Sequence, residues 1–152
     1  MMRFALDSNV ILYAEGLNDD RRRDLAHRLI RAIGPGNLVI PLQALGETVA
    51  RLTKGTRTSK AEAAMQVAPW FHSLKTQDTN RAVFADAGEL ISKHKLQFWD
   101  AVILAAASAG GASILLSEDM HDGFRWRETV VVNPFAPEPP PIIQMLLDND
   151  NS

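Results

Sequence analysis

The sequence contains no cysteine, and this absence excludes disulfide bonds and thiolate metal sites. Long apolar runs are also missing. The longest run, residues 101–107 with its flanks, is far shorter than the roughly 20 residues that a membrane-spanning helix requires. Asp7 interrupts the apolar start of the chain, whereas a secretory signal needs a continuous apolar core. We therefore expect a cytoplasmic protein that does not cross a membrane.

Length and composition are those of one globular domain, with 152 residues of which 46% are hydrophobic. We expect this domain to occupy residues 1–134 and a proline-rich tail to occupy residues 135–152. Five prolines lie between positions 134 and 141, and a short apolar segment, residues 142–147, follows them. This segment predicts a small docking helix. The sequence leaves open whether the helix packs on its own domain or on another chain.

The formal net charge of −2 lacks the basic excess that is typical of nucleic-acid binders. However, if four acidic residues serve an ion, 14 acidic residues remain against 16 basic ones. The remaining surface then has a formal charge of +2, which permits binding to a polyanion. Basic residues gather in two groups, although solvated helix faces explain most of them. The groups are Arg21, Arg22, Arg23, Arg28 and Arg31, and Arg51, Lys54, Arg57 and Lys60.

Short apolar runs alternate with segments of helical periodicity along the chain. The runs predict strands at residues 4–6, 38–40, 113–116 and 130–132. The periodic segments predict helices at residues 10–13, 24–33, 41–52, 59–72, 81–94 and 99–109, with Pro69 disturbing the fourth; residues 74–79 fit neither pattern. This alternation predicts an α/β fold, in which a short, mostly parallel central sheet is flanked by helices on both faces.

Four acidic residues lie far apart in sequence but at related places in this predicted fold. Asp7 and Asp119 follow strands, and the carboxyl ends of parallel strands form one edge of a sheet, where ligands bind. Asp100 begins an apolar helix, and Glu47 lies on a helix after the second strand. Three of them also have a purely structural explanation, namely a helix cap for Asp7, the helix dipole for Asp100 and solvent exposure for Glu47.

Carboxylates are costly to bring together in a partly dry place unless a cation neutralises them. If the four acids converge, they therefore predict a divalent metal ion. Oxygen ligands suit Mg²⁺ or Mn²⁺, whereas zinc is disfavoured because His121 has no second histidine at a typical ligand spacing. Asp122 precedes Gly123 and serves either as an outer ligand or as a turn residue.

Four segments, FALDSNVILY, LGETVARL, FWDAVILAAA and ILLSEDMHDG, resemble in order and spacing the four motifs of PIN-domain nucleases, specifically the VapC-like toxins of type II toxin–antitoxin pairs. The resemblance extends from residue 4 to about residue 134. It implies that the metal-site acids are Asp7, Glu47, Asp100 and Asp119, with Asp122 as an additional acid. It also implies supporting roles for Ser8, Asn9 and Ser117.

The resemblance further implies an endoribonuclease that depends on Mg²⁺ or Mn²⁺ and acts as a toxin. The implied partners are RNA as substrate, a cognate antitoxin protein and a second copy of the chain in a homodimer, for which residues 142–147 and the pair Trp70 and Phe71 are candidate contacts. Two alternatives remain. One is a non-catalytic metal-binding module. The other is an α/β phosphatase with Asp7 as nucleophile, which would often carry a second aspartate where this chain has Asn9.

Overall fold

In the computed structural model, which describes residues 2–17 and 19–150, six strands form one sheet in the order β3-β2-β1-β4-β6-β5. Every pair of neighbours is parallel except β5 and β6, which are antiparallel. The predicted α/β fold with a mostly parallel sheet is therefore confirmed. The strands are β1 (Phe4–Leu6), β2 (Leu38–Pro41), β3 (Lys75–Gln77), β4 (Ile114–Leu116), β5 (Arg125–Trp126) and β6 (Thr129–Val132).

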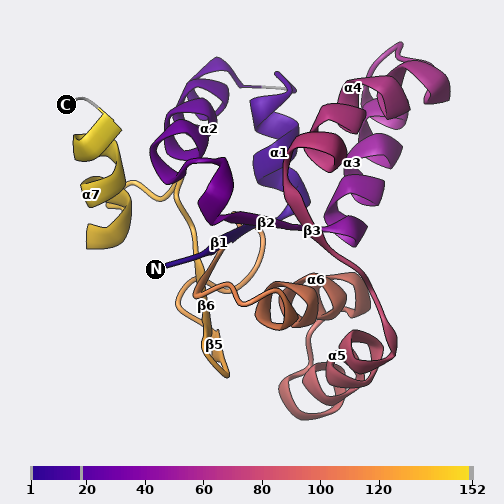
Figure 1. The fold of residues 1–152 in the computed structure, drawn as a ribbon, viewed down its shortest axis with the longest axis vertical. Coiled ribbons are helices and arrows are strands. Elements are labelled where there is room, and N and C mark those ends of the chain that lie inside the picture. The colour runs from indigo at the N-terminus through magenta and orange to yellow at the C-terminus, as the bar shows by residue number, and fades with distance from the viewer. Residues whose placement is uncertain (1, 18, 151–152) are drawn as a thin grey trace.

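Helices cover both faces of this sheet, as Figure 1 shows. Helices α1 to α4 lie on one side, and α5 and α6 lie on the other. Parallel strands need crossover connections, and helices that supply them cover the sheet on both faces. The helices are α1 (Ser8–Ala14), α2 (Asp20–Ile33), α3 (Leu42–Gly55), α4 (Lys60–Ser73), α5 (Arg81–His94), α6 (Phe98–Ala109) and α7 (Pro141–Asp150), with a 3₁₀ turn η1 (Pro35–Asn37) before β2.

The core forms around β1, β4 and α6. Residues 101–107 of α6 are fully buried, so this helix is the central one that its apolar sequence predicts. Strand β1 lies between β2 and β4, and Leu6 is paired with Leu116. The backbone N–H of Asp7 extends this pairing by donating to the carbonyl of Leu116 at 2.9 Å. Residues that follow β1 and β4 therefore emerge side by side at one edge of the sheet.

Several element boundaries differ from the prediction. Helix α2 begins four residues earlier than predicted because the Asp19 carboxylate caps it, accepting from the N–H groups of Arg21 and Arg22. The unassigned residues 74–79 contain the edge strand β3, and the short hairpin strand β5 was not predicted. Pro69 does not end α4. The carbonyl that it leaves without a partner belongs to Met65, which is 76% exposed, so water can replace the missing bond.

The tail helix α7 packs against α2 (Figure 1). Its residues Ile143 and Leu146 are buried, whereas Met145 is half-exposed. Arg31 of α2 forms a two-pronged ion pair with Asp150 at 2.9 Å. The apolar tail segment, residues 142–147, thus packs in part on its own domain. In the described residues, no helix is long and apolar enough to cross a membrane.

Trp70, which was considered together with Phe71 as a contact for a second chain, is less exposed than its sequence suggests. It is partly buried, and its indole Nε1–H donates to the carboxylate of Glu15 at 2.9 Å. Buried indole N–H groups generally find such a partner. Phe71 is 50% exposed and remains as the accessible half of that pair.

Helix α6 approaches β2 so closely at Gly110 that a side chain does not fit. A Cβ atom there would lie 2.9 Å from Cγ2 of Val39. Because Val39 is β-branched and fully buried, we expect Gly110→Ala to destabilise the protein by about 1–3 kcal/mol through overpacking. Denaturant unfolding measures the effect. Gly88→Ala in α5 is the control, since a Cβ added there would meet no atom within 4 Å, and it should stabilise by about 0.5–1 kcal/mol. Equal effects of both changes would contradict the close approach.

Candidate functional site

The carboxylate of Asp7 lies at the end of β1, where it caps α1. It is only 3% exposed and accepts three hydrogen bonds. The backbone N–H of Ser8 donates to Oδ1 at 2.7 Å, and Ser117 Oγ and Asn9 Nδ2 donate to Oδ2 at 2.7 and 3.3 Å. Asp7 is therefore a helix cap, as its sequence position predicts. However, a cap does not need to be buried, and it does not need the additional hydrogen bonds from Ser117 and Asn9.

Burial raises the pKa of Asp7 from 3.8 to about 6. The hydrogen bonds from Ser117 and Ser8 act in the opposite direction, since they favour the charged form. The negative charges of Asp100 and Glu47 raise the pKa of Asp7 further. A buried carboxylate with acidic neighbours is an unfavourable arrangement for the protein alone, and a bound cation would relieve it.

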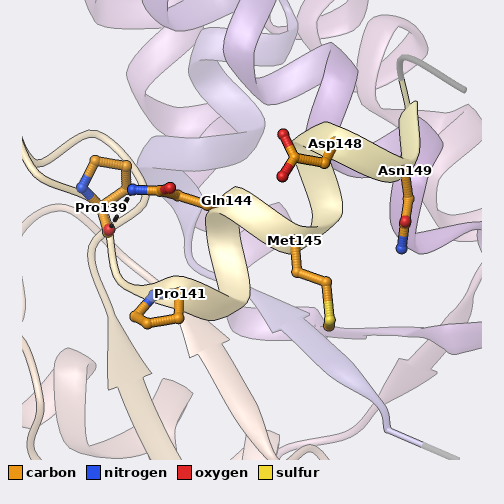
Figure 2. A pocket seen from close by; sticks show the side chains of 6 residues that line it. All are labelled: Pro139, Pro141, Gln144, Met145, Asp148 and Asn149. Carbon is orange, nitrogen blue, oxygen red and sulfur yellow. Dashed lines mark hydrogen bonds between the residues drawn. The ribbon is translucent and has the colours of Figure 1, made fainter.

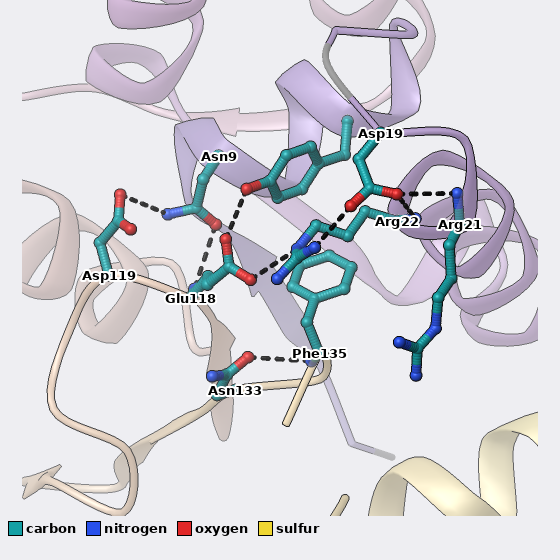
Figure 3. A network of polar contacts seen from close by, with 9 residues as sticks. Asn9, Asp19, Arg21, Arg22, Glu118, Asp119, Asn133 and Phe135 are labelled. Carbon is teal, nitrogen blue, oxygen red and sulfur yellow. Dashed lines mark hydrogen bonds and ion pairs between the residues drawn. The ribbon is translucent and has the colours of Figure 1, made fainter. Parts of the chain in front are cut away.

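Asn9 connects two of the predicted site acids. Its Nδ2 donates to Asp7 Oδ2 and to Asp119 Oδ2, both at 3.3 Å, and its Oδ1 accepts from the backbone N–H of Glu118 at 3.1 Å. Figure 3 shows this amide between Asp119 and Glu118. Because Asn9 lies in α1 and both Glu118 and Asp119 follow β4, the amide fixes the loop after β4 against the first turn of α1.

Glu47 reaches the same region from α3. It is partly buried, and Ser8 Oγ donates to its Oε2 at 3.0 Å. Burial raises the pKa of Glu47, the hydrogen bond from Ser8 lowers it, and the charge of Asp100 raises it. Helical periodicity places Glu47 opposite the apolar stripe of α3. However, α3 packs against α1, and the bond from Ser8 in α1 shows that Glu47 faces that helix and not only solvent.

Asp100 lies in the first turn of α6 and is half-buried. Burial raises its pKa, and the charge of Asp119 raises it further. Asp100 in turn acts on Asp7 and Glu47. The four predicted acids, which come from four separate parts of the sequence, thus lie near one another at one edge of the sheet. Ser8 and Asn9 join three of them by hydrogen bonds. Asp100 is close enough for its charge to interact with the others.

Asp119 is exposed and borders two cavities. The smaller one, of about 60 Å³, is also lined by Asn9, Tyr13 and Arg51. The larger one, of about 330 Å³, is also lined by Asp100 and His121. We name this larger hollow the α6 cavity.

Asp122 has a different position. It is exposed, and its Oδ1 accepts from the backbone N–H of Asn133 at 2.9 Å. This bond stabilises the loop that contains Gly123, whose φ of +87° suits glycine. The turn role considered from the sequence is therefore present in the structure.

The donor set suits a hard divalent cation, since it consists of carboxylate oxygens with amide and hydroxyl groups around them. Among the described residues, however, no three acidic or histidine side chains lie close enough to enclose one ion as they stand. Mg²⁺ retains several water molecules and needs only one or two protein carboxylates. The residues present therefore fit a partly hydrated ion beside Asp7, and they do not fit a closed structural site such as that of zinc.

Sequence reasoning missed a polar network beside these acids, shown in Figure 3. The Tyr13 hydroxyl donates to Glu118 Oε1, Arg22 Nε donates to Glu118 Oε2 at 2.7 Å, and Arg22 also pairs with Asp19. Burial, together with the hydrogen bond and charge of Glu118, raises the pKa of Tyr13 to about 12. The sequence showed Arg22 only as one of several arginines, because neither periodicity nor spacing reveals a partner 96 residues away.

The sequence of residues 4–124 matches the PIN domain family. Since this match covers most of the chain, the protein belongs to the PIN domain family. The match begins at β1 and ends just after β4 and its following loop, so it includes all four acids and their hydrogen-bonding partners. A search of curated proteins by sequence found no match.

Solved structures with the same fold include VapC toxins. VapC20 of Mycobacterium tuberculosis, described as a sarcin–ricin loop cleaving toxin, is 20% identical with a TM-score of 0.60 over 74% of this chain and 86% of that one. A toxin–antitoxin complex from Klebsiella pneumoniae is 17% identical (TM-score 0.63; 83% and 94% covered). VapBC2 from Rickettsia felis, bound to a promoter DNA fragment, is 18% identical (TM-score 0.61; 86% and 97%). These likenesses show a shared fold.

Removing the Ser117 hydroxyl should affect both stability and the Asp7 carboxylate. Ser117 is fully buried, and its Oγ also accepts from the backbone N–H of Met120 at 3.2 Å. Because Ser117→Ala leaves that N–H without a partner and leaves Asp7 Oδ2 with only the longer bond from Asn9, we expect a loss of about 1–3 kcal/mol in the free energy of unfolding and a higher Asp7 pKa. Denaturant unfolding and carboxyl NMR titration measure the two effects. The control, Ser92→Ala on an exposed helix surface, should change stability by less than about 0.5 kcal/mol; similar losses in both variants would rule out the assigned role.

Proposed function

We propose that this protein is a metal-dependent endoribonuclease that acts as the toxin of a toxin–antitoxin pair. The observation that carries the proposal is the buried Asp7 carboxylate, coupled to Glu47, Asp100 and Asp119 at the carboxyl edge of the sheet in a chain of the PIN domain family. Such a cluster is a poor stability device and a suitable site for a divalent cation. The toxin structures that share the fold support the biological role.

In this proposal Asp7 and Asp100 are the principal ligands of Mg²⁺ or Mn²⁺, Glu47 completes the site, and Asp119 binds a second ion or an outer water. Asp122 remains an additional outer ligand in the proposal. When bound, the ion supplies an activated water and stabilises the charge that develops on a phosphodiester. No side chain of the protein then needs to act as a nucleophile.

The protein's own side chains would hold this arrangement in place. Ser117, Ser8 and Asn9 orient the Asp7 carboxylate by the three hydrogen bonds described above. Glu47, held by the hydrogen bond from Ser8 Oγ, would complete the site or orient a water molecule. Arg51 shares the small cavity with Asp119 and would bind a substrate phosphate.

We further propose two protein partners, a cognate antitoxin and a second copy of the chain, and a cytoplasmic location where RNA is available. Toxin–antitoxin complexes among the structural neighbours support the first partner. Residues 1–134 would form the nuclease domain and residues 135–152 a tail that docks through α7. Light scattering at high protein concentration should detect a dimer, and a purely monomeric protein would remove the homodimer from the proposal.

The test of the enzyme is incubation with a panel of cellular RNAs under three conditions: added Mg²⁺, added Mn²⁺, and excess chelator. We expect internal cuts that need the ion and that are lost in Asp100→Asn. Intact RNA together with release of phosphate from small esters would favour the phosphatase. Ion binding without any hydrolysis would favour the non-catalytic module.

A further inference from the structure

The α6 cavity lies beside two of the acids and is large enough for a small ligand. Its volume of about 330 Å³ lies at the small end of the roughly 300–1,000 Å³ of small-molecule pockets. Asp100 and Asp119 form part of its lining. A group seated in this cavity would therefore lie next to any bond that these acids help to cut.

The rest of the lining is apolar, aromatic and amide. Leu104, Met120 and Val131 contribute apolar surface, and the rings of His94 and Phe124 pack edge to face with centroids 5.4 Å apart. Gln97 adds a carboxamide, which offers both donors and an acceptor. Although Gln97 stands at the N-cap of α6, its side chain does not cap the helix, so the amide is not used for that purpose.

Exposed aromatic residues lie at the same end of α6. Phe98 and Trp99 follow Gln97 directly; the ring centroids of Phe98 and Trp99 lie 4.7 Å apart, and those of Phe98 and Phe84 of α5 lie 6.0 Å apart. These rings are 39%, 53% and 60% exposed for Phe98, Trp99 and Phe84. Exposed aromatic groups beside a phosphodiester-cleaving site are suited to stacking on unpaired bases.

From these features we infer that the α6 cavity binds one unpaired nucleobase of the substrate, with Gln97 reading its hydrogen-bonding edge and neighbouring bases stacking on Trp99. This inference rests on the proposed ribonuclease function and adds to it a residue, Gln97, that would determine which base is accepted at one position. Bases in a duplex are stacked and paired, and their edges are accessible only when the strand is open. The cavity thus selects both strand state and base identity at one position.

Two other hollows of the structure do not combine these features. The pocket in Figure 2 is lined only by the tail and α7, by Pro139, Pro141, Gln144, Met145, Asp148 and Asn149. A third pocket, between α2 and the tail, is lined by Arg21, Arg22, Phe135 and proline residues and contains none of the four acids.

The experiment compares cleavage of short single-stranded RNAs that differ at one nucleotide next to the cut. The native chain should prefer one base, and Gln97→Ala should reduce that preference by about tenfold. The same sequence in a perfect duplex should be cut at least about tenfold more slowly. Unchanged base preference in Gln97→Ala, or equal cleavage of duplex RNA, would overturn the inference.

A binding measurement separates this inference from the proposed function. The Asp7→Asn chain is mixed with a single-stranded RNA that carries a fluorescent adenine analogue, and stacking is followed by quenching. We expect quenching that weakens about tenfold in affinity when Trp99→Ala is added, since a stacked base contributes substantially to binding. Quenching without any cleavage by the native chain would contradict the ribonuclease but not the base site. Cleavage without quenching would contradict the base site alone.

Discussion

Asp7→Asn should reduce RNA cleavage by at least about a hundredfold with little change in KM. Asp7 is the most buried of the four acids and accepts hydrogen bonds from three residues. An amide of the same shape keeps the packing but removes the charge that would hold the ion. Loss of electrostatic stabilisation worth several kcal/mol in the transition state gives a rate loss of this size. Steady-state cleavage of a labelled RNA measures it.

An exposed aspartate in the tail serves as the control for this result. Asp148→Asn changes this acid in α7 and should leave cleavage within about twofold. Asp122→Asn tests the additional outer ligand: a reduced rate would support that role, and an unchanged rate would leave Asp122 only its turn bond from Asn133. Native-like cleavage by Asp7→Asn, or equal losses in all three variants, would remove Asp7 from the chemistry.

The second large effect concerns stability in the absence of divalent ions. The pKa of Asp7 is raised in the folded state from 3.8 to about 6, so its contribution to stability is fully present below about pH 4 and is lost as the pH rises through about 6. The shift corresponds to about 3 kcal/mol. The Asp7→Asn protein cannot ionise at this position and therefore serves as the reference. With chelator present, the free energy of unfolding of the native chain should fall by about 3 kcal/mol between pH 4 and 7 relative to that of Asp7→Asn.

Urea unfolding of the two proteins at both pH values measures this effect. Subtracting the free energy of unfolding of Asp7→Asn from that of the native chain removes the contribution of groups that titrate alike in both proteins. Adding Mn²⁺ at pH 7 should restore stability to the native chain, because a ligand that binds only the folded state stabilises it. The Asp7→Asn chain should gain much less. If the two proteins differed in free energy of unfolding by the same amount at both pH values, the pKa of Asp7 would not be raised in the folded state.

The fold was largely predictable because its main signals are local. The apolar runs at β1, β2 and β4 and the apolar sequence of α6 each reveal an element, and their alternation determines the parallel sheet. The elements that escaped prediction lack such signals. Strand β3 is polar and lies at the edge of the sheet, and β5 has only two residues, so neither buries a recognisable apolar run.

The site was predictable in part, for a different reason. Asp7 and Asp119 follow neighbouring strands, and the geometry of a parallel sheet brings them together. Periodicity gave no reason to include Glu47. It was included because its helix follows the second strand and because its surrounding segment resembles a family motif. Tyr13 and Arg22 could not be assigned at all, since their partner Glu118 is brought close only by the packing of α1 and α2 beside β4.

The most direct test of the account is a crystal structure of the native protein soaked with Mn²⁺, with anomalous scattering used to locate the metal. We predict an anomalous peak about 2.0–2.3 Å from a carboxylate oxygen of Asp7, with Asp100 as the second principal ligand and water completing the coordination. Crystals that contain Mn²⁺ only elsewhere on the surface, with these carboxylates free of metal, would contradict the claim that the acids form an ion-binding site.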